Sequence, residues 1–227
     1  MDIADRLVRA AGDGDVGEVV RLLGQGAVVD APDRDGRTAL DLAVEQGHAD
    51  VVRRLVAAGA DPEQQAGEYR ESTPLCLAAR HGHTTVVGVL LDAGARTGIQ
   101  GRLGHVPLVL AATTGDEGHP KTVDLLLDRG ADVNAVMKHR TALDWAVRFG
   151  QEEMVRRLLG RGAIPSAETL AAAREIASIA SLVASAFFRT DAPGRSQGGL
   201  LPALDRPRAP DTGCSGVRGP RSGGVRP

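Results

Sequence analysis

Apolar residues recur along the chain at a spacing that predicts pairs of short helices. Val51, Val52, Leu55 and Val56 stand at positions i, i+1, i+4 and i+5, so they form one stripe on a helix. Similar stripes end at glycine–alanine pairs: Gly26-Ala27, Gly59-Ala60, Gly94-Ala95, Gly130-Ala131 and Gly162-Ala163. Glycine can adopt the positive φ that stops a helix, so each pair predicts a helix end.

A second pattern, Thr-x-Leu-x-x-Ala, precedes four of these stripes and predicts the other helix of each pair. It begins at Thr38, Thr73, Val106 and Thr141, in steps of 35, 33 and 35 residues. The two predicted helices of a unit are separated by short boxes: Gly47-His48, Gly82-His83, Gly118-His119 and Gly150-Gln151. A period of this length with a Thr-Pro-Leu box resembles the ankyrin repeat, a β-turn followed by two helices. The resemblance implies an all-α solenoid of helix-turn-helix units joined by β-turn or hairpin loops.

The repeats divide the chain into four parts. We expect an N-terminal capping half-repeat over residues 1–30, four ankyrin repeats over 31–165, a C-terminal capping helix over 166–188 and a disordered tail over 189–227. The repeats fall at about 31–64, 65–99, 100–135 and 136–165. The cap is predicted from helical apolar spacing after Ser166, and this spacing fits one helix or two short ones. From residue 191 onward, 6 Pro and 8 Gly in 37 residues predict disorder.

Several residues depart from the repeat pattern. Val106 replaces the threonine, Gln151 replaces the histidine, and Glu71 and His139 replace a turn glycine. The third unit also contains three extra residues within 113–117. Such an insertion is expected to loop out between the two helices of its unit, either as a neutral surface loop or as a contact loop.

Composition bounds the function further. Alanine, leucine and valine must build the core, because aromatic residues make up only 2% of the 227 residues. Two cysteines, one on a predicted buried helix, favour a reducing, cytoplasmic setting. No basic stretch followed by an apolar run opens the chain, and its longest charge-free apolar stretch is too short to cross a membrane. The abundance of Ala, Gly and Arg suggests a bacterial source.

The sequence contains no signature of catalysis, so we expect a protein that is not an enzyme and needs no cofactor or metal. His81 and His83 have metal-like spacing, but His83 belongs to the Gly-His box, where we expect structural hydrogen bonds. Asp41 and Asp144 are expected to accept hydrogen bonds from turns at helix starts. They belong to non-adjacent units and therefore cannot form a catalytic pair.

The positions that the repeat leaves free are the candidates for partner binding. In ankyrin-repeat proteins, partners usually dock on the hairpin tips and on the concave side formed by the first helices. The matching positions here are Arg34, Asp35, Arg37, Glu45, Gln46, Tyr69, Arg70, Ser72, Arg80, His81, Arg102, Leu103, His105, Thr113, Thr114, Met137, Lys138, Arg140, Arg148 and Phe149. They carry eight basic and two acidic residues, and we expect Tyr69, Met137 and Phe149 to be exposed anchors.

This basic concave face predicts a monomeric module that binds another protein with an acidic or mixed surface, and no membrane or nucleic acid. The net charge of the whole chain is −2, and the tail, with six arginines and three aspartates, contributes +3. The chain before residue 191 therefore carries a net charge of −5, and the positive charge of the candidate face contrasts with it. The alternative is a regulatory or immunity-type subunit whose basic tail also contacts nucleic acid or an enzyme.

Overall fold

The computed structural model describes residues 2–65, 72–98 and 103–190, which lie within one compact unit, residues 1–192. These residues form twelve helices and one small hairpin. The helices are α1 (Ile3–Gly12), α2 (Val16–Gly24), α3 (Ala39–Glu45), α4 (Ala49–Ala57), α5 (Pro74–Arg80), α6 (Thr84–Asp92), α7 (Pro107–Thr113), α8 (Pro120–Asp128), α9 (Ala142–Arg148), α10 (Glu152–Gly160), α11 (Ala167–Ala173) and α12 (Ala177–Thr190). The strands are β1 (Val136–Met137) and β2 (Arg140–Thr141).

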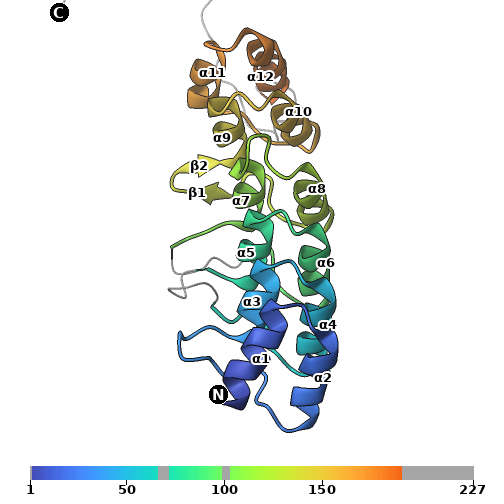
Figure 1. Ribbon diagram of the computed structural model, residues 1–227. Coiled ribbons are helices and arrows are strands. Elements are labelled where there is room, and N and C mark those ends of the chain that lie inside the picture. Colours follow the sequence, from blue (N-terminus) through green and yellow to red (C-terminus); the bar gives the residue numbers. More distant parts are fainter. Residues whose placement is uncertain (1, 66–71, 99–102, 191–227) are drawn as a thin grey trace, which may run out of the picture. The chain divides into compact units, whose positions relative to one another are not determined.

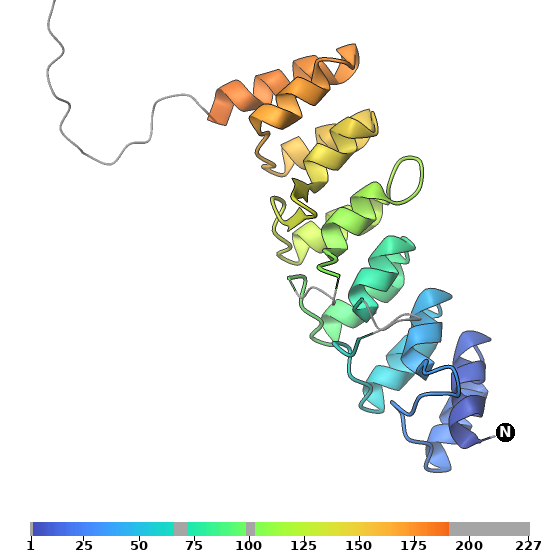
Figure 2. The same ribbon diagram turned by 90° about the vertical axis from the view of Figure 1, so that its left-hand side faces the viewer.

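The helices stack in two columns, as Figures 1 and 2 show. The first helices of the units form one column, in which α1, α3, α5, α7, α9 and α11 contact one another in chain order. The second helices, α2 to α12, form the other column and pack against their own first helices. The fold class is therefore the expected solenoid of helix pairs.

The core consists of small and branched aliphatic side chains, as the composition requires. In each of four first helices the leucine of the Thr-x-Leu box is closed to solvent: Leu40, Leu75, Leu108 and Leu143. The second helices contribute Leu22, Leu55, Leu90, Leu126 and Leu158, which are equally buried. Alanine in the first helices lets neighbouring units approach closely, so the buried residues form one continuous cluster from Leu7 to Val183.

Threonine caps explain where the first helices begin. The hydroxyl of Thr38 accepts a hydrogen bond from the amide of Asp41, whose carboxylate accepts one from the amide of Thr38 at 2.9 Å. Thr141 and Asp144 form the same reciprocal pair. The expected role of both aspartates at helix starts is thus confirmed. Val106 has no side-chain cap, which is the defect that its sequence predicts.

The Gly-His boxes connect each unit to the preceding one. Nε2 of the histidine donates a hydrogen bond to a main-chain carbonyl near the end of the preceding first helix: His48 to Gly12 (3.0 Å), His83 to Glu45 (2.9 Å) and His119 to Arg80 (3.1 Å). The amide of Gln151 donates a corresponding bond to the carbonyl of Asp116 at 3.1 Å. The predicted structural role of the box is confirmed, and glutamine performs it as well.

Two helices, and not one, follow the last repeat. The cap at Ser166 is present, and three residues separate the end of α11 at Ala173 from the start of α12 at Ala177. Helix α11 packs on α9 and α12 packs on α10, with Ile179 and Val183 fully buried. Of the two arrangements that the spacing allowed, the pair is the one formed. It continues the two columns of the stack instead of laying one long helix across its end.

Candidate binding face

The first-helix face is the surface formed by the first helices and by the hairpin loops that precede them, on the left in Figure 1. The first helices of the four repeats, α3, α5, α7 and α9, each end at two residues of the candidate set. Glu45, Gln46, Arg80, His81, Arg148 and Phe149 are all exposed there. Between these pairs, Thr113 and Thr114 are half-buried, because their hydroxyls donate to the carbonyls of Val109 and Leu110 within α7. The exposed pairs therefore lie at the C-terminal ends of α3, α5 and α9.

The hairpin of the fourth repeat is the best-defined loop of this face. Val136 pairs with Thr141 and Met137 pairs with Arg140 in antiparallel register. The two connecting residues, Lys138 and His139, have φ values of 52° and 65°. Positive φ at both central positions is typical of the type I′ turn, which glycine and asparagine prefer. Both side chains at this tip are exposed.

Two candidate arginines in the N-terminal part of the face already have acidic partners within the chain. Arg34 pairs with Asp5 at 3.3 Å, and Arg37 pairs with Asp33 at 3.1 Å and with Asp35 at 2.9 Å. Hydrogen bonds from the backbone and side chain of Arg37 hold the pKa of Asp33 below its ordinary value, although burial acts in the opposite direction. The N-terminal part of the face is therefore a balanced ion-pair network and not a free positive surface.

Other candidate cations are unpaired. Within the described residues, Arg80, Lys138 and Arg148 are exposed and form no ion pair. Arg140 is half-buried and pairs with Glu168 at 2.9 Å. Free positive charge on the described part of the face is thus concentrated in α5, α9 and the hairpin before α9.

Some candidates are not presented to solvent, and three lie outside the described residues. The expectation that Met137 is an exposed anchor is wrong, because this side chain is only 8% exposed and packs in the core cluster. Ser72 is 7% exposed, so it offers little to a partner. His105 is half-buried and Leu103 is 53% exposed. The candidates outside the described residues are Tyr69, Arg70 and Arg102.

An aromatic cluster on α9 extends the candidate set by one residue. The rings of Trp145 and Phe149 stack with centroids 5.7 Å apart and an interplanar angle of 19°. The Arg140 guanidinium lies 5.6 Å from the centroid of the Trp145 ring. Trp145 is not among the candidates because they are the positions outside the repeat pattern, whereas Trp145 lies inside the Thr-x-Leu-x-x-Ala box. The other units have Leu42, Leu77 and Leu110 at its position, and this contrast is the signal that could have identified it.

The insertion in the third unit forms a loop between α7 and α8. Figure 2 shows it extending past the ends of the neighbouring helices. Gly115, Asp116 and Glu117 are exposed there, and the carbonyl of Asp116 accepts the hydrogen bond from Gln151. The loop therefore leaves the stack intact, as expected for an insertion in a solenoid.

Several histidines and acidic residues of the described chain have structural contacts, and these residue types form no metal-binding cluster there. No group of three or more His, Cys, Asp or Glu side chains among the described residues could hold a metal ion. His81 and His83 stack with centroids 5.7 Å apart, but His83 donates to the Glu45 carbonyl. Burial lowers the pKa of His81 below its ordinary value, and the neighbouring His83 and Arg80 act in the same direction.

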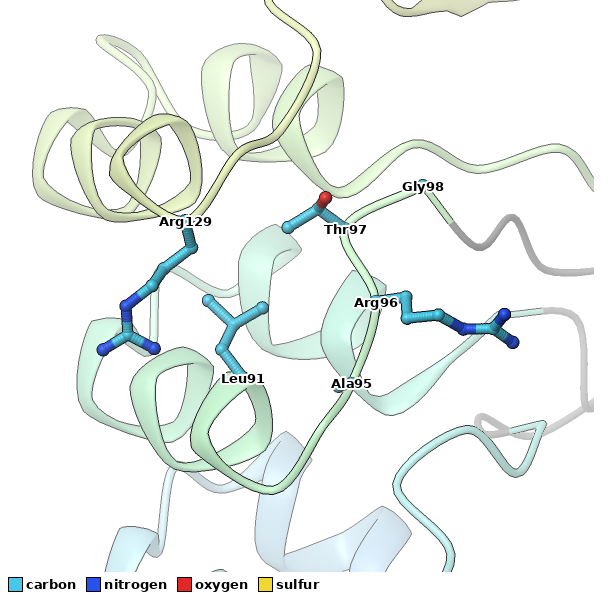
Figure 3. Close-up of a pocket in the computed structure, with 6 residues that line it drawn as sticks. All are labelled: Leu91, Ala95, Arg96, Thr97, Gly98 and Arg129. Atoms are coloured by element: carbon cyan, nitrogen blue, oxygen red, sulfur yellow. The ribbon is translucent and has the colours of Figure 1, made fainter.

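The pocket shown in Figure 3 does not change this assessment. It has a volume of about 580 Å³ and lies between the C-terminal ends of α6 and α8, lined by Leu91, Ala95, Arg96, Thr97, Gly98 and Arg129. Arg96 pairs with Glu63 and Arg129 pairs with Asp92, so both cations have acidic partners. Thr97 contributes a hydroxyl but has no base beside it in this lining.

In the part of the chain that the structure describes, no helix is long and apolar enough to span a membrane.

Comparison with known proteins agrees with this architecture. The family profile described as ankyrin repeats (3 copies) matches residues 6–66, 58–137 and 75–169. Human neurogenic locus notch homolog protein 2 is 36% identical over 157 residues, which is 67% of this chain but 6% of that protein. Human ankyrin repeat domain-containing protein 63 is 57% identical over 42 residues, or 18% of this chain and 11% of that protein.

A third relative has the name of an enzyme. L-asparaginase of Dirofilaria immitis is 31% identical over 160 residues, which is 70% of this chain and 26% of that protein. The chain thus corresponds to only a small part of each of these relatives. Because the family profile covers most of the sequence and the helix pairs stack at the predicted period, the chain belongs to the ankyrin-repeat family.

Proposed function

We propose that the chain binds another protein through its first-helix face and has no catalytic role of its own. Ankyrin repeats are generic protein-interaction modules, and the observation that supports this particular face is its unpaired charge. Arg80, Lys138 and Arg148 have no acidic partner among the described residues, and exposed Phe149 lies beside Arg148. Aromatic and arginine side chains are enriched among the residues that dominate binding energy.

The partner is proposed to present an acidic or mixed surface to this face. Complementary charge mainly accelerates association, and its effect decreases with salt because screening acts over about 8 Å at physiological ionic strength. The rest of the proposal is a monomer in a reducing compartment such as the cytoplasm, a setting that suits a chain with only two cysteines. The alternative function through the basic tail concerns residues 191–227, which lie outside the described residues.

A capture experiment tests the proposal. The tagged chain is used to retrieve partners from its native cells, and the proteins are identified by mass spectrometry. Arg80→Glu combined with Arg148→Glu should remove the retrieved partner at physiological salt, because two unpaired cations become anions on the binding face. Both side chains are exposed, so the circular dichroism spectrum should remain unchanged.

The matched control is Arg54→Glu, which reverses one exposed arginine in α4, in the second-helix column. This variant should retrieve the partner as the unmodified chain does. Equal retrieval by all three proteins would place the binding surface elsewhere. The first alternative to examine would be the insertion loop around Gly115.

A further inference from the structure

The fourth repeat concentrates features that are dispersed elsewhere on the described face. Trp145 and Phe149 stack along α9, and Phe149 is 55% exposed. Arg140 covers the Trp145 ring from the hairpin side, and its guanidinium also pairs with Glu168 of α11. An aromatic pair with an arginine over it provides rigid apolar area at low conformational cost, which is the usual make-up of an interface anchor.

The hairpin beside this stack has a strained backbone. Lys138 and His139 are the residues other than glycine that have positive φ in the described part of the chain. The matching position in the first full repeat is Gly36, which has a φ of 78° and no side chain to strain. Strain of this kind persists where the surroundings or a function maintain it. Here it places two exposed side chains at the tip that leads into Arg140.

A difference in charge pairing separates this face from the opposite one at the same level of the stack. The arginines of the second-helix column here are all engaged: Arg129 with Asp92, Arg156 with Glu152 and Glu153, Arg157 with Asp124 and Glu153, and Arg161 with Asp124 and Asp128. By contrast, Lys138 in the hairpin and Arg148 at the end of α9 have no carboxylate partner among the described residues. The fourth repeat therefore carries positive charge that the described residues do not neutralise at both ends of α9.

The geometry points to an anchor site for a partner peptide segment that places a large apolar side chain on Phe149 and Trp145 and a carboxylate against Lys138 at the hairpin tip. This inference rests on the proposed function and gives it a location and a partner chemistry. The carboxylate belongs at the hairpin end of α9, because the acidic insertion loop, with Asp116 and Glu117, lies near Gln151 at the other end. A segment bound in the opposite direction would bring its acid towards those two side chains.

A protein segment fits these residues better than a nucleic acid does. Bases also stack on aromatic rings beside cations, but they bring phosphates at every nucleotide. Glu168 is 71% exposed beside Arg140, and Asp116 and Glu117 are exposed in the neighbouring loop. A continuous row of phosphates would meet these carboxylates, whereas a peptide can restrict its charge to the hairpin end.

The single tryptophan of the chain makes the site directly observable. Random 16-residue peptides displayed on phage are selected on the immobilised full chain, and enriched peptides are synthesised and titrated by tryptophan fluorescence. The library omits tryptophan, so that the only indole observed is Trp145. The expected selection enriches Asp or Glu next to Phe or Leu, and binding should shift the emission of Trp145. Phe149→Ala and Lys138→Glu should each weaken the peptide affinity about tenfold or more. The control Val28→Ala, which truncates a side chain exposed to 68% far from α9 in the sequence, should change it less than about twofold.

The outcomes separate this inference from the proposed function. If selected peptides leave the Trp145 emission unchanged and bind Phe149→Ala equally well, the anchor site is wrong. If the same peptides still lose affinity with Arg80→Glu and Arg148→Glu, the proposal that the first-helix face binds a partner is supported. Enrichment of basic peptides, or a fluorescence shift with a single-stranded oligonucleotide and not with peptides, overturns the anchor chemistry. If no peptide is enriched and no native partner is retrieved, both proposals fail.

Discussion

Single hydrogen bonds join each unit of the stack to the one before it. The imidazole of His83 lies over Gly47, where an added Cβ would come within 2.8 Å of the ring, and its Nε2 reaches the carbonyl of Glu45. Gly47 has a φ of 79°, so the position both needs positive φ and leaves space for the ring. The pair of residues, glycine and histidine, therefore acts as one device that fixes the spacing of consecutive units.

Replacing His83 tests this device. His83→Ala should lower the free energy of unfolding by about 1–3 kcal/mol, because the Glu45 carbonyl loses its donor and the ring leaves a gap. His83→Gln should cost less, since Gln151 makes the corresponding bond to Asp116 in this chain. Urea titrations of both variants measure the difference. Equal losses for alanine and glutamine would mean that ring packing, and not the hydrogen bond, carries the effect.

A second contact between units involves the residue four positions after the glycine of the Gly-Ala pair. Oε1 of Glu63 accepts from the amide of Arg96 at 2.7 Å, and Oδ1 of Asn134 accepts from the amide of Ile164 at 2.9 Å. Asp30 occupies the same place in the first unit. Burial raises the pKa of the Asp30 carboxyl above its ordinary value; a backbone hydrogen bond from Asp61 opposes this, and the Asp61 charge adds to it.

The raised pKa gives a pH-dependent prediction. A carboxyl whose pKa is higher in the folded state than in the unfolded state binds protons more tightly when the chain is folded. Its charged form therefore destabilises the fold at neutral pH. This destabilisation disappears when the pH falls below the unfolded-state pKa of about 3.9. Asp30→Asn keeps an amide oxygen as acceptor and removes the charge. It should stabilise the chain at pH 7 by about 0.2–1 kcal/mol, the range of exposed charge pairs, and by less as the pH falls towards 4. Thermal melts of both proteins at several pH values measure this difference. A stabilisation by Asp30→Asn that stays constant with pH would contradict the prediction.

Helix caps at the element scale offer a matched pair of substitutions. Thr73 accepts from the amide of Cys76 at 3.2 Å, whereas Val106 offers no acceptor at the start of α7. Both residues are buried to the same degree, at 4% exposure. Val106→Thr should therefore stabilise the chain by about 1 kcal/mol, and Thr73→Val should cost a similar amount. Denaturant midpoints of the two variants should move in opposite directions; a loss in both would mean that the hydroxyl cannot reach its amide in α7.

The elements themselves could be predicted because ankyrin units repeat the same local signals. The Gly-Ala pairs, the threonine boxes and the Gly-His boxes each fix one helix end through backbone chemistry close in sequence. The first-helix face was less predictable, because exposure depends on neighbouring units. Met137 is placed inward by the hairpin register, and Arg34, Arg37 and Arg140 are neutralised by carboxylates that the periodicity does not reveal. The stack on α9 also required the structure, since an i, i+4 spacing alone does not distinguish a core pair from a surface pair.

At the scale of the whole stack, each unit is stabilised by its neighbours, so the ends are the places where it opens first. Helices α11 and α12 cover the fourth repeat, with Ile179 of α12 fully buried. The hydroxyl of Thr169 in α11 also donates a hydrogen bond to the Asp144 carboxylate of α9. The final helix pair is therefore attached to both columns. Loosening it should affect the fourth repeat before the first.

Ile179→Asp makes that order measurable. A carboxylate in this buried position costs several kcal/mol unless it takes up a proton or the helix detaches, so α12 should separate from α10. Amide hydrogen exchange should then accelerate around Leu158, which is fully buried in α10, while amides around Leu55 in α4 keep their protection. The conservative Ile179→Val should cost only about 0.5–1.5 kcal/mol and leave exchange near Leu158 slow. Unchanged exchange at Leu158 in the aspartate variant would show that α12 does not protect the repeat, and equal acceleration at Leu55 would show that the stack opens as one unit.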